Sequence, residues 1–366
     1  MIDLFKPYMP PKLPLLNDIL HSGNLAYGKW ARQFEKQLCQ YIQVDNLMVT
    51  TSYGMALQVL LASLGIKPGD EVILSPIACL QSTQPLASFG MKLVWADIDP
   101  NTGTLDPTSV KSKITSRTKI ILHNHFCGYV GYIDEINELG KGHGIITLDD
   151  CLEAFGSEYK GKLMGNQQTD ISIFSFQTIR LPNSIDGGAL NINNDALFKK
   201  ALKTRDLGID RSIFRDEHGE ISCNCDIPSI GYAATPNDVN SYIGAIQMKD
   251  IDPLISIQRQ NAIAWEEVLS EKKGIRPLQA RKGINPNYWI YGVLSDNKIE
   301  DMLGFREQGF YSSSVHVPNN IYSIFGKNDV RLSGVRDFYN KFIAIPSGWW
   351  VNTDQIKSYG IQKGQY

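Results

Sequence analysis

The chain has 366 residues, and its 36 Lys and Arg residues nearly balance its 38 Asp and Glu residues, giving a net charge of −2. No segment is basic enough to follow a phosphate backbone, so nucleic acid is not an expected partner. The longest apolar runs are far shorter than the roughly 20 residues needed to cross a bilayer, and the proline-containing N-terminus does not match a secretory signal. We therefore expect a cytoplasmic protein without a membrane partner.

The six cysteines lie mostly inside apolar or strand-like segments and form no spaced framework, which is typical of a reduced intracellular protein. Cys223 and Cys225 are close together, but one pair supplies too few ligands for a metal site. We predict ordinary loop thiols here and no bound metal.

Between residues 30 and 192, short apolar strands alternate with helical segments. The helical segments have apolar residues at helical spacing or end at glycine-containing turns, and they cover residues 30–42, 55–64, 85–89 and 133–139. The predicted strands cover residues 47–50, 71–74, 93–96, 118–122, 144–148, 171–176 and 188–192. Strands separated by helices predict an α/β domain with a mainly parallel sheet, which binds ligands at the carboxyl ends of its strands.

The pattern changes after residue 193. Residues 194–210 and 237–271 are predicted to be helical, and the long irregular segment 211–236 between them is more typical of a functional or interfacial segment than of a plain connector. Further short strands are expected at residues 288–294, 312–317 and 341–345. We predict an N-terminal segment and large α/β domain over residues 1–235, and a smaller α+β domain over residues 236–366.

Seven stretches occur in an order and spacing that resemble one known family. They are LGIKPGDEVILSP (64–76), VWADIDPNTGTLD (94–106), HFCGYVGYIDEI (125–136), HGIITLDDCLEAFGSEYKGKLMG (143–165), DISIFSFQTIR (170–180), DGGAL (186–190) and GYAATPNDVNSYIGAIQM (231–248). The chain resembles the DegT/StrS-type nucleotide-sugar aminotransferases, which depend on pyridoxal phosphate (PLP). The resemblance implies the aspartate aminotransferase-like fold type I, with a seven-stranded, mainly parallel sheet. It also implies a homodimer and a nucleotide-linked sugar ligand.

Three polar residues match positions where the family holds its cofactor. Asp150 matches the acid that keeps the pyridine nitrogen of PLP protonated, and its alternative role is to cap a helix. Glu153 lies where family members usually have glutamine, so a second carboxylate would change the charge near the ring. Ser175 matches a phosphate-binding hydroxyl, and a strand serine without a ligand is the alternative.

Several other positions depart from the family pattern. The phosphate-binding turn of the family, Ser-Gly-Thr at a helix N-terminus, corresponds to Ser52-Tyr53-Gly54, which keeps the backbone N–H groups but loses one hydroxyl. Cys79 lies where the family stacks an aromatic ring on the cofactor. Ala233 lies where the partner subunit normally lends an asparagine to the phosphate. These changes weaken the predicted cofactor site.

Arg180 occupies the position of the Schiff-base lysine in the family motif Ser-Phe-x-x-x-Lys. A guanidinium stays protonated and cannot form an imine, so standard transamination is not expected, and PLP or PMP (pyridoxamine phosphate) could bind only non-covalently. Arg180 could instead bind a carboxylate or phosphate through two hydrogen bonds. The alternative is a packing arginine that pairs with Asp186.

Tyr27 and His316 are the candidate contacts to a nucleotide-linked sugar, although ordinary packing would explain both equally well. We predict a family protein that binds such a sugar without standard aminotransferase turnover. Two alternatives stay open. One is an aminotransferase or dehydratase that uses non-covalent PLP or PMP, and the other is a non-catalytic subunit that pairs with an active paralogue.

Overall fold

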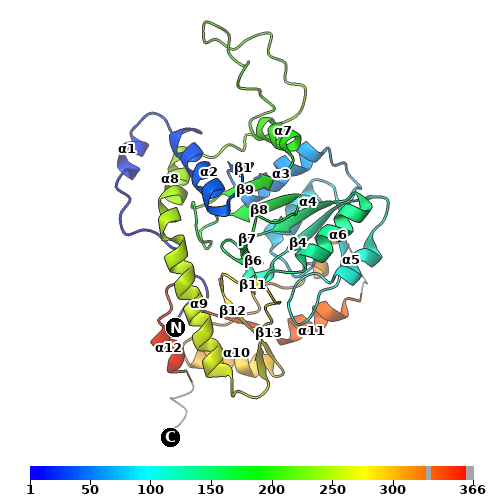
Figure 1. Cartoon of the computed structure of the whole chain (residues 1–366), viewed down its shortest axis with the longest axis vertical. Helices are drawn as coiled ribbons and strands as arrows, with labels where there is room; N and C mark the ends of the chain where they lie inside the picture. The colour runs from blue at the N-terminus through cyan, green and yellow to red at the C-terminus, as the bar shows by residue number, and fades with distance from the viewer. Residues whose placement is uncertain (327–330, 360–366) are drawn as a thin grey trace.

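A computed structural model describes residues 1–326 and 331–359. Its centre is a seven-stranded sheet in the order β1-β9-β8-β5-β4-β2-β3 (Figure 1). In that order the strands are β1 (Leu47–Thr50), β9 (Gly188–Ile192), β8 (Ile171–Ser175), β5 (Ile146–Asp150), β4 (Thr118–Asn124), β2 (Glu71–Leu74) and β3 (Lys92–Trp95). All neighbouring strands are parallel except β9, which runs antiparallel to β1 and β8. The predicted seven-stranded, mainly parallel sheet is confirmed.

Helices cover both faces of this sheet because alternate strand residues point to opposite sides. Val72 and Leu74 of β2 belong to the apolar core under α3 and α4, while Ile73 between them belongs to the core under α5 and α6. The helices around the sheet are α2 (Lys29–Ile42), α3 (Tyr53–Leu64), α4 (Leu80–Ser88), α5 (Pro107–Lys113), α6 (Ile133–His143) and α7 (Asp195–Arg205).

Helices α8 (Asp238–Gln247) and α9 (Ile251–Leu269) follow one another along one side of the molecule and lead to a second sheet (Figure 1). This sheet is antiparallel, in the order β10 (Ile275–Pro277), β12 (Tyr291–Ser295) and β13 (Phe342–Ile345). Helices α10 (Lys298–Glu307) and α11 (Ser333–Lys341) lie between β12 and β13 in the chain, and α12 (Thr353–Lys357) follows β13. Trp265 of α9 is fully buried in the core beside this second sheet.

The remaining elements are short. They are α1 (Leu16–Leu20), a small sheet of β6 (Glu158–Tyr159), β7 (Lys162–Leu163) and β11 (Ile284–Asn285), and the 3-10 turns η1 (Phe126–Gly128), η2 (Met248–Asp250), η3 (Asn319–Ile321) and η4 (Ser323–Phe325). No helix within the described ranges is both long enough and apolar enough to cross a membrane.

The strand predicted over residues 312–317 is wrong. Within it only Ser313 pairs, in an isolated bridge to Ala344, and Val315 has φ +59°. A positive φ interrupts an extended chain, so residues 312–317 do not form a strand.

Two predicted helices differ from the structure at a proline. The helix expected over residues 85–89 is longer, since α4 begins at Leu80 and contains Pro85 in its interior. The helix expected over residues 237–271 is divided by the turn η2, just before Pro253 in the first turn of α9. Proline is tolerated in a first turn but not in the middle of a continuous helix, so the chain starts a new helix there.

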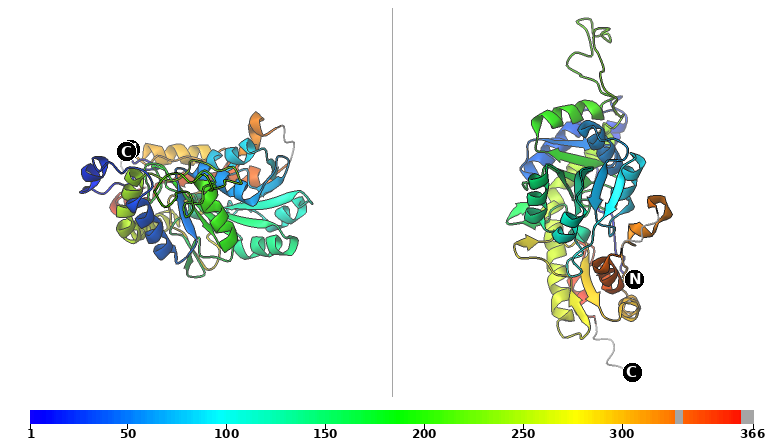
Figure 2. Two further views of the ribbon diagram at one scale, coloured as in Figure 1. Left: turned by 90° about the horizontal axis from the view of Figure 1, so that it is seen from above. Right: turned by 90° about the vertical axis from the view of Figure 1, so that its right-hand side faces the viewer.

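Residues 206–237, all of which the structure describes, form no helix or strand. Much of this segment projects from the large domain as an arm (Figures 1 and 2). Four of its isoleucines are exposed: Ile213, Ile221, Ile227 and Ile230. The predicted irregular excursion is therefore present.

Candidate active site

Two of the predicted site residues lie at the carboxyl ends of neighbouring parallel strands. Asp150 ends β5 and Ser175 ends β8. The buried Asp150 carboxylate accepts a hydrogen bond from the Ser82 hydroxyl (2.6 Å) and one from the Leu152 N–H (3.1 Å). Burial raises the pKa of Asp150, because these neutral donors offset the lost hydration only in part.

Tyr53 extends from the start of α3 toward Asp150. Its side chain is 1% exposed, and its hydroxyl donates a hydrogen bond to Ser82 Oγ at 3.3 Å. Burial, and then the nearby Asp150 carboxylate, raise the pKa of Tyr53 well above its ordinary value. A buried hydrogen-bonded chain thus runs from Tyr53 through Ser82 to Asp150. Sequence analysis assigned no role to Ser82, because only the position of α4 beside β5 reveals it.

Arg180 is also buried, at 5% exposure, and its partners are an aromatic ring and a carboxylate. The guanidinium lies 4.3 Å from the centre of the Trp289 ring, and its Nη2 lies 3.6 Å from Glu153 Oε1. The alternative pairing with Asp186 is wrong, since the Asp186 carboxylate accepts a hydrogen bond from the Gly187 N–H instead (2.9 Å). Arg180 therefore lies against Glu153 rather than Asp186, and its Nε and Nη1 are buried without a hydrogen-bond partner among the described residues.

Glu153 connects Arg180 with His316. The His316 Nε2 lies 3.0 Å from Glu153 Oε1, and the Cys127 N–H donates a hydrogen bond to Glu153 Oε2 (2.6 Å). Burial acts to raise the pKa of Glu153, but His316, Arg180 and the Cys127 N–H together lower it. The structure therefore brings Glu153, Arg180 and His316 into one polar cluster, although 163 residues separate Glu153 from His316.

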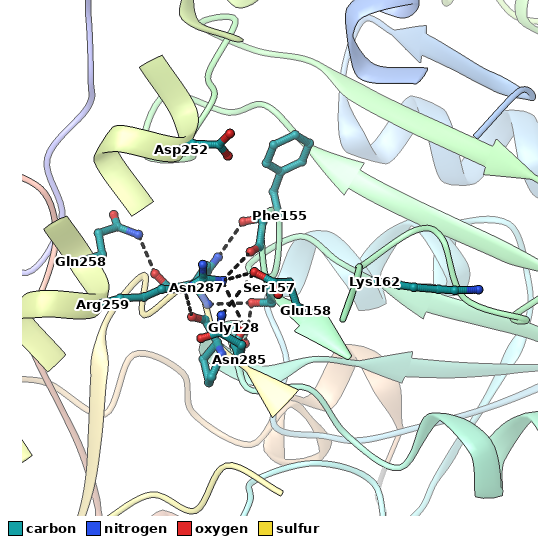
Figure 3. A network of polar contacts seen from close by, with 12 residues as sticks. Gly128, Phe155, Ser157, Glu158, Lys162, Asp252, Gln258, Arg259, Asn285 and Asn287 are labelled. Carbon is teal, nitrogen blue, oxygen red and sulfur yellow. Dashed lines mark hydrogen bonds and ion pairs between the residues drawn. The ribbon is translucent and has the colours of Figure 1, made fainter. Parts of the chain in front are cut away.

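Asn287, in the link between β11 and β12, is hydrogen-bonded to the turn of residues 153–157, and Figure 3 shows it beside Phe155 and Ser157. Its side-chain amide donates to the carbonyls of Glu153 (2.8 Å) and Phe155 (3.0 Å), and its backbone N–H donates to Ser157 Oγ (2.9 Å). Gly128 lies against this network with φ +87°, and a Cβ there would be 2.1 Å from Asn287 Oδ1. Only glycine fits at that position.

The residues predicted to bind phosphate do not share one cavity. Ser52 caps α3, where its Oγ accepts a hydrogen bond from the Met55 N–H (3.2 Å), and with Gly54 it lines an open groove of about 480 Å³. Ser175 instead borders the small cavity beside Arg180, and its Oγ accepts a hydrogen bond from the Gln177 N–H (3.4 Å).

Cys79 and Tyr27 lie in two different places. Cys79 precedes α4 and borders the cavity beside Asp150, where burial raises the pKa of its thiol. Tyr27 borders a separate cavity of about 890 Å³, formed with the end of α7 and the base of the arm. Its hydroxyl donates a hydrogen bond to Glu35 (2.6 Å), and Arg205 lies 4.9 Å from its ring centre.

The space around Asp150 and Arg180 does not fit PLP in the way the family resemblance implies. The cavity beside Asp150 and the cavity beside Arg180 each measure about 10 Å³, which is room for about one water, whereas ligand pockets typically exceed about 300 Å³. No lysine lines either cavity, among the residues that the structure describes. The side chains of Tyr53 and Arg180 fill this part of the molecule.

His123, His125 and Asp149 form a buried cluster near this site. Asp149 Oδ1 lies 3.2 Å from His125 Nε2 and 3.6 Å from His123 Nδ1. The other nitrogen of His125, Nδ1, accepts a hydrogen bond from the Gly131 N–H (3.2 Å), so it does not donate one. Metal-binding histidines have the opposite arrangement. The cluster is therefore a set of close, buried His–Asp contacts, in which His123 Nδ1, His123 Nε2 and His125 Nε2 have no hydrogen-bond partner in the part of the chain that the structure describes.

The fold and the arrangement of these strands define a PLP-transferase-like protein, and comparison with known proteins identifies the family. The model of the DegT/DnrJ/EryC1/StrS aminotransferase family matches residues 11–358, and the chain belongs to this family. Structural neighbours that share the fold include a sugar aminotransferase and an aminotransferase involved in the biosynthesis of pseudoaminic acid. The predicted family and the predicted fold type I architecture are confirmed.

Individual relatives are similar over most of their length. The Bacillus subtilis (strain 168) spore coat polysaccharide biosynthesis protein SpsC is 25% identical over 366 residues, covering 94% of each chain. The Escherichia coli O157:H7 GDP-perosamine synthase is 27% identical over 298 residues, covering 80% of this chain and 78% of that one. The structure of the sugar aminotransferase CalS13 from Micromonospora echinospora matches with a TM-score of 0.91 at 23% identity, covering 100% of both chains. The family acts in nucleotide-sugar and polysaccharide biosynthesis.

Proposed function

We propose that this protein binds a nucleotide-linked sugar in surface-polysaccharide or related metabolism, without transaminating through a lysine-bound cofactor. The observation that carries the proposal is the buried side chain of Arg180, held by Glu153 and Trp289 at the position where the resemblance implies the Schiff-base lysine. The metabolic setting is supported by the family and by relatives named for spore coat polysaccharide biosynthesis and perosamine synthesis.

The chemistry of Arg180 supports the absence of a covalent cofactor link. PLP, when bound in an aminotransferase, acts as an electron sink that a lysine amine tethers. An arginine keeps its proton at any working pH, and the Arg180 guanidinium lies beside the Glu153 carboxylate. Arg180 therefore neither supplies a neutral amine nor moves a proton at a substrate carbon. Its role in this chain is to neutralise Glu153 and to pack on Trp289.

The Tyr27 cavity supports the proposed sugar ligand. Its size of about 890 Å³ lies within the range of small-molecule sites. Arg32 and Lys199 on its lining have no acidic partner within 4 Å among the described residues. Unpaired cations beside an aromatic ring suit a diphosphate with an attached base or sugar. In this proposal Tyr27, Arg32 and Lys199 bind the nucleotide part.

Two measurements test the proposal together. Calorimetric titration with UDP-, GDP- and dTDP-linked sugars should give saturable binding for at least one of them. An absorbance spectrum of the purified protein, before and after borohydride, should show no reducible aldimine band. An aldimine band would mean that another lysine tethers the cofactor. Absence of binding across the whole panel would contradict the proposed ligand.

We also propose that the chain forms a homodimer through its arm. The exposed isoleucines of the arm, Ile230 at 87% exposure among them, would be covered by a second subunit. Light scattering on the purified chain should therefore give twice the monomer mass. A monomer that dimerises only with an active paralogue would favour the alternative of a non-catalytic partner subunit. Amino transfer to a keto-sugar by added PMP would favour the alternative of a non-covalent enzyme.

A further inference from the structure

We propose that Tyr53 is a built-in replacement for the cofactor ring, so that the chain folds with its ring site closed to PLP and PMP. The inference is independent of the proposed sugar ligand, which uses a different cavity. It concerns one side chain and the space that this side chain fills.

Tyr53 spans the two points between which PLP is held. A helix N-terminus is a natural site for the cofactor phosphate, and an acid holds the pyridine nitrogen at the other end of the molecule. The backbone of Tyr53 forms the first residue of α3, directly after the cap Ser52. Its hydroxyl reaches Ser82, whose own hydroxyl is 2.6 Å from Asp150 Oδ2. The phenol ring lies between these ends.

The packing leaves no space for a second ring. Tyr53 is 1% exposed, and the cavity bordered by Cys79, Ser82, Asp150 and Glu153 measures about 10 Å³. A buried aromatic side chain occupies far more volume than that, so a pyridine ring could enter only if Tyr53 left. The side chain of Tyr53 would have to break its hydrogen bond to Ser82 in order to leave.

The hydrogen-bond chemistry around Asp150 supports the same inference. A pyridinium would offer Asp150 a positive charge, but the groups that donate hydrogen bonds to it here are neutral: the Ser82 hydroxyl and the Leu152 N–H. The Tyr53 hydroxyl completes this arrangement as a neutral donor to Ser82. The Asp150 carboxylate thus receives its hydrogen bonds from groups of the chain itself.

The test removes the Tyr53 ring and measures whether a small aromatic molecule binds in its place. Tyr53→Ala should lower the melting temperature, and saturating phenol or PMP should restore part of it, by about 2 °C or more. Engineered apolar cavities bind small aromatic molecules in this way. The wild-type melting temperature should not change with either ligand. PMP is the appropriate probe because, unlike PLP, it cannot form imines with surface lysines.

Two controls make the result specific to this site. Tyr242→Ala opens a space at an equally buried tyrosine of α8, and PMP should not stabilise it. Tyr53→Phe keeps the ring and loses the hydroxyl, and it should also not bind PMP. Saturable PMP binding to the wild-type protein that Asp150→Asn abolishes would overturn the inference. A folded Tyr53→Ala variant that binds neither phenol nor PMP would also overturn it. If Tyr53→Ala does not fold, the wild-type titration still decides the question.

Discussion

The region around Asp150 and the region around Tyr27 differ in almost every property that matters for ligand binding. Around Asp150 and Arg180, polar groups are buried, Arg180 Nε and Nη1 have no hydrogen-bond partner within the described ranges, and each cavity measures about 10 Å³. Around Tyr27 the cavity measures about 890 Å³ and its lining carries unpaired cations. This difference supports both of our proposals: that Tyr53 closes the cofactor-ring site, and that the Tyr27 cavity binds the nucleotide-linked sugar.

The largest effect is expected when the buried Arg180 loses the carboxylate that neutralises it. Glu153→Ala would leave Arg180 buried without its carboxylate, so we expect a loss of about 3–5 kcal/mol in the free energy of unfolding. Urea denaturation measures it. Glu135→Ala, which removes the half-exposed partner of Arg281, is the matched control and should cost below about 1 kcal/mol. Equal losses for the two variants would contradict a closed ionic cluster.

Arg32→Ala and Lys199→Ala test the other region, the Tyr27 cavity. Each removes one unpaired cation from the Tyr27 cavity, and we expect affinity for the nucleotide-linked sugar to fall about tenfold per variant. Calorimetric titration gives the dissociation constants. Lys119→Ala, an exposed lysine of β4 outside this cavity, is the control and should leave the affinity unchanged.

The Arg180→Lys variant tests whether a lysine at this position is sufficient for PLP to bind covalently. We expect no aldimine band with added PLP, because Tyr53 still fills the ring space. We also expect a loss of about 1 kcal/mol in stability, since a lysine stacks less well on Trp289. Absorbance and urea denaturation are the measurements. Amino transfer by this single variant would show that the remaining site is intact.

The contribution of Asp150 to stability can be isolated by its dependence on pH. Its pKa in the folded protein is raised above 3.8 by burial, so folding favours the protonated acid. The stabilisation is therefore complete below about pH 4 and is lost as the pH rises through the raised value. Asp150→Asn should remove this loss, so its stability relative to wild type should increase with pH. Urea denaturation from pH 4 to 8 tests this, with the exposed Asp18→Asn as the control.

The smallest expected effect concerns the arm. Ile230→Ser should change the free energy of unfolding of the monomer by no more than about 0.5 kcal/mol, because the side chain is 87% exposed. It should nevertheless weaken the homodimer, which sedimentation at several concentrations would detect. Ile299→Ser, exposed on α10, should have no effect on the dimer. An unchanged dimer for Ile230→Ser would place the interface elsewhere.

The sequence predicted the sheet well because its strands are short apolar runs bounded by turns. It also predicted that Asp150 and Ser175 end strands, since the chain order of a parallel sheet brings such ends to one edge. The pairing of Glu153 with His316 could not be predicted, because the two residues come from opposite parts of the chain. The direction of the Tyr53 side chain, toward Ser82 and Asp150, could not be predicted either, because it depends on how α3, α4 and β5 are arranged in space. The two-residue strands β6 and β7 carry too few residues for any periodicity.

The aromatic ring of Tyr53 has a consequence for the life of the protein in the cell. A ring that is part of the polypeptide is installed by the ribosome, in every copy and at the moment of synthesis. Maturation of this chain would then be independent of vitamin B6 supply, and its abundance should stay constant when that vitamin becomes scarce.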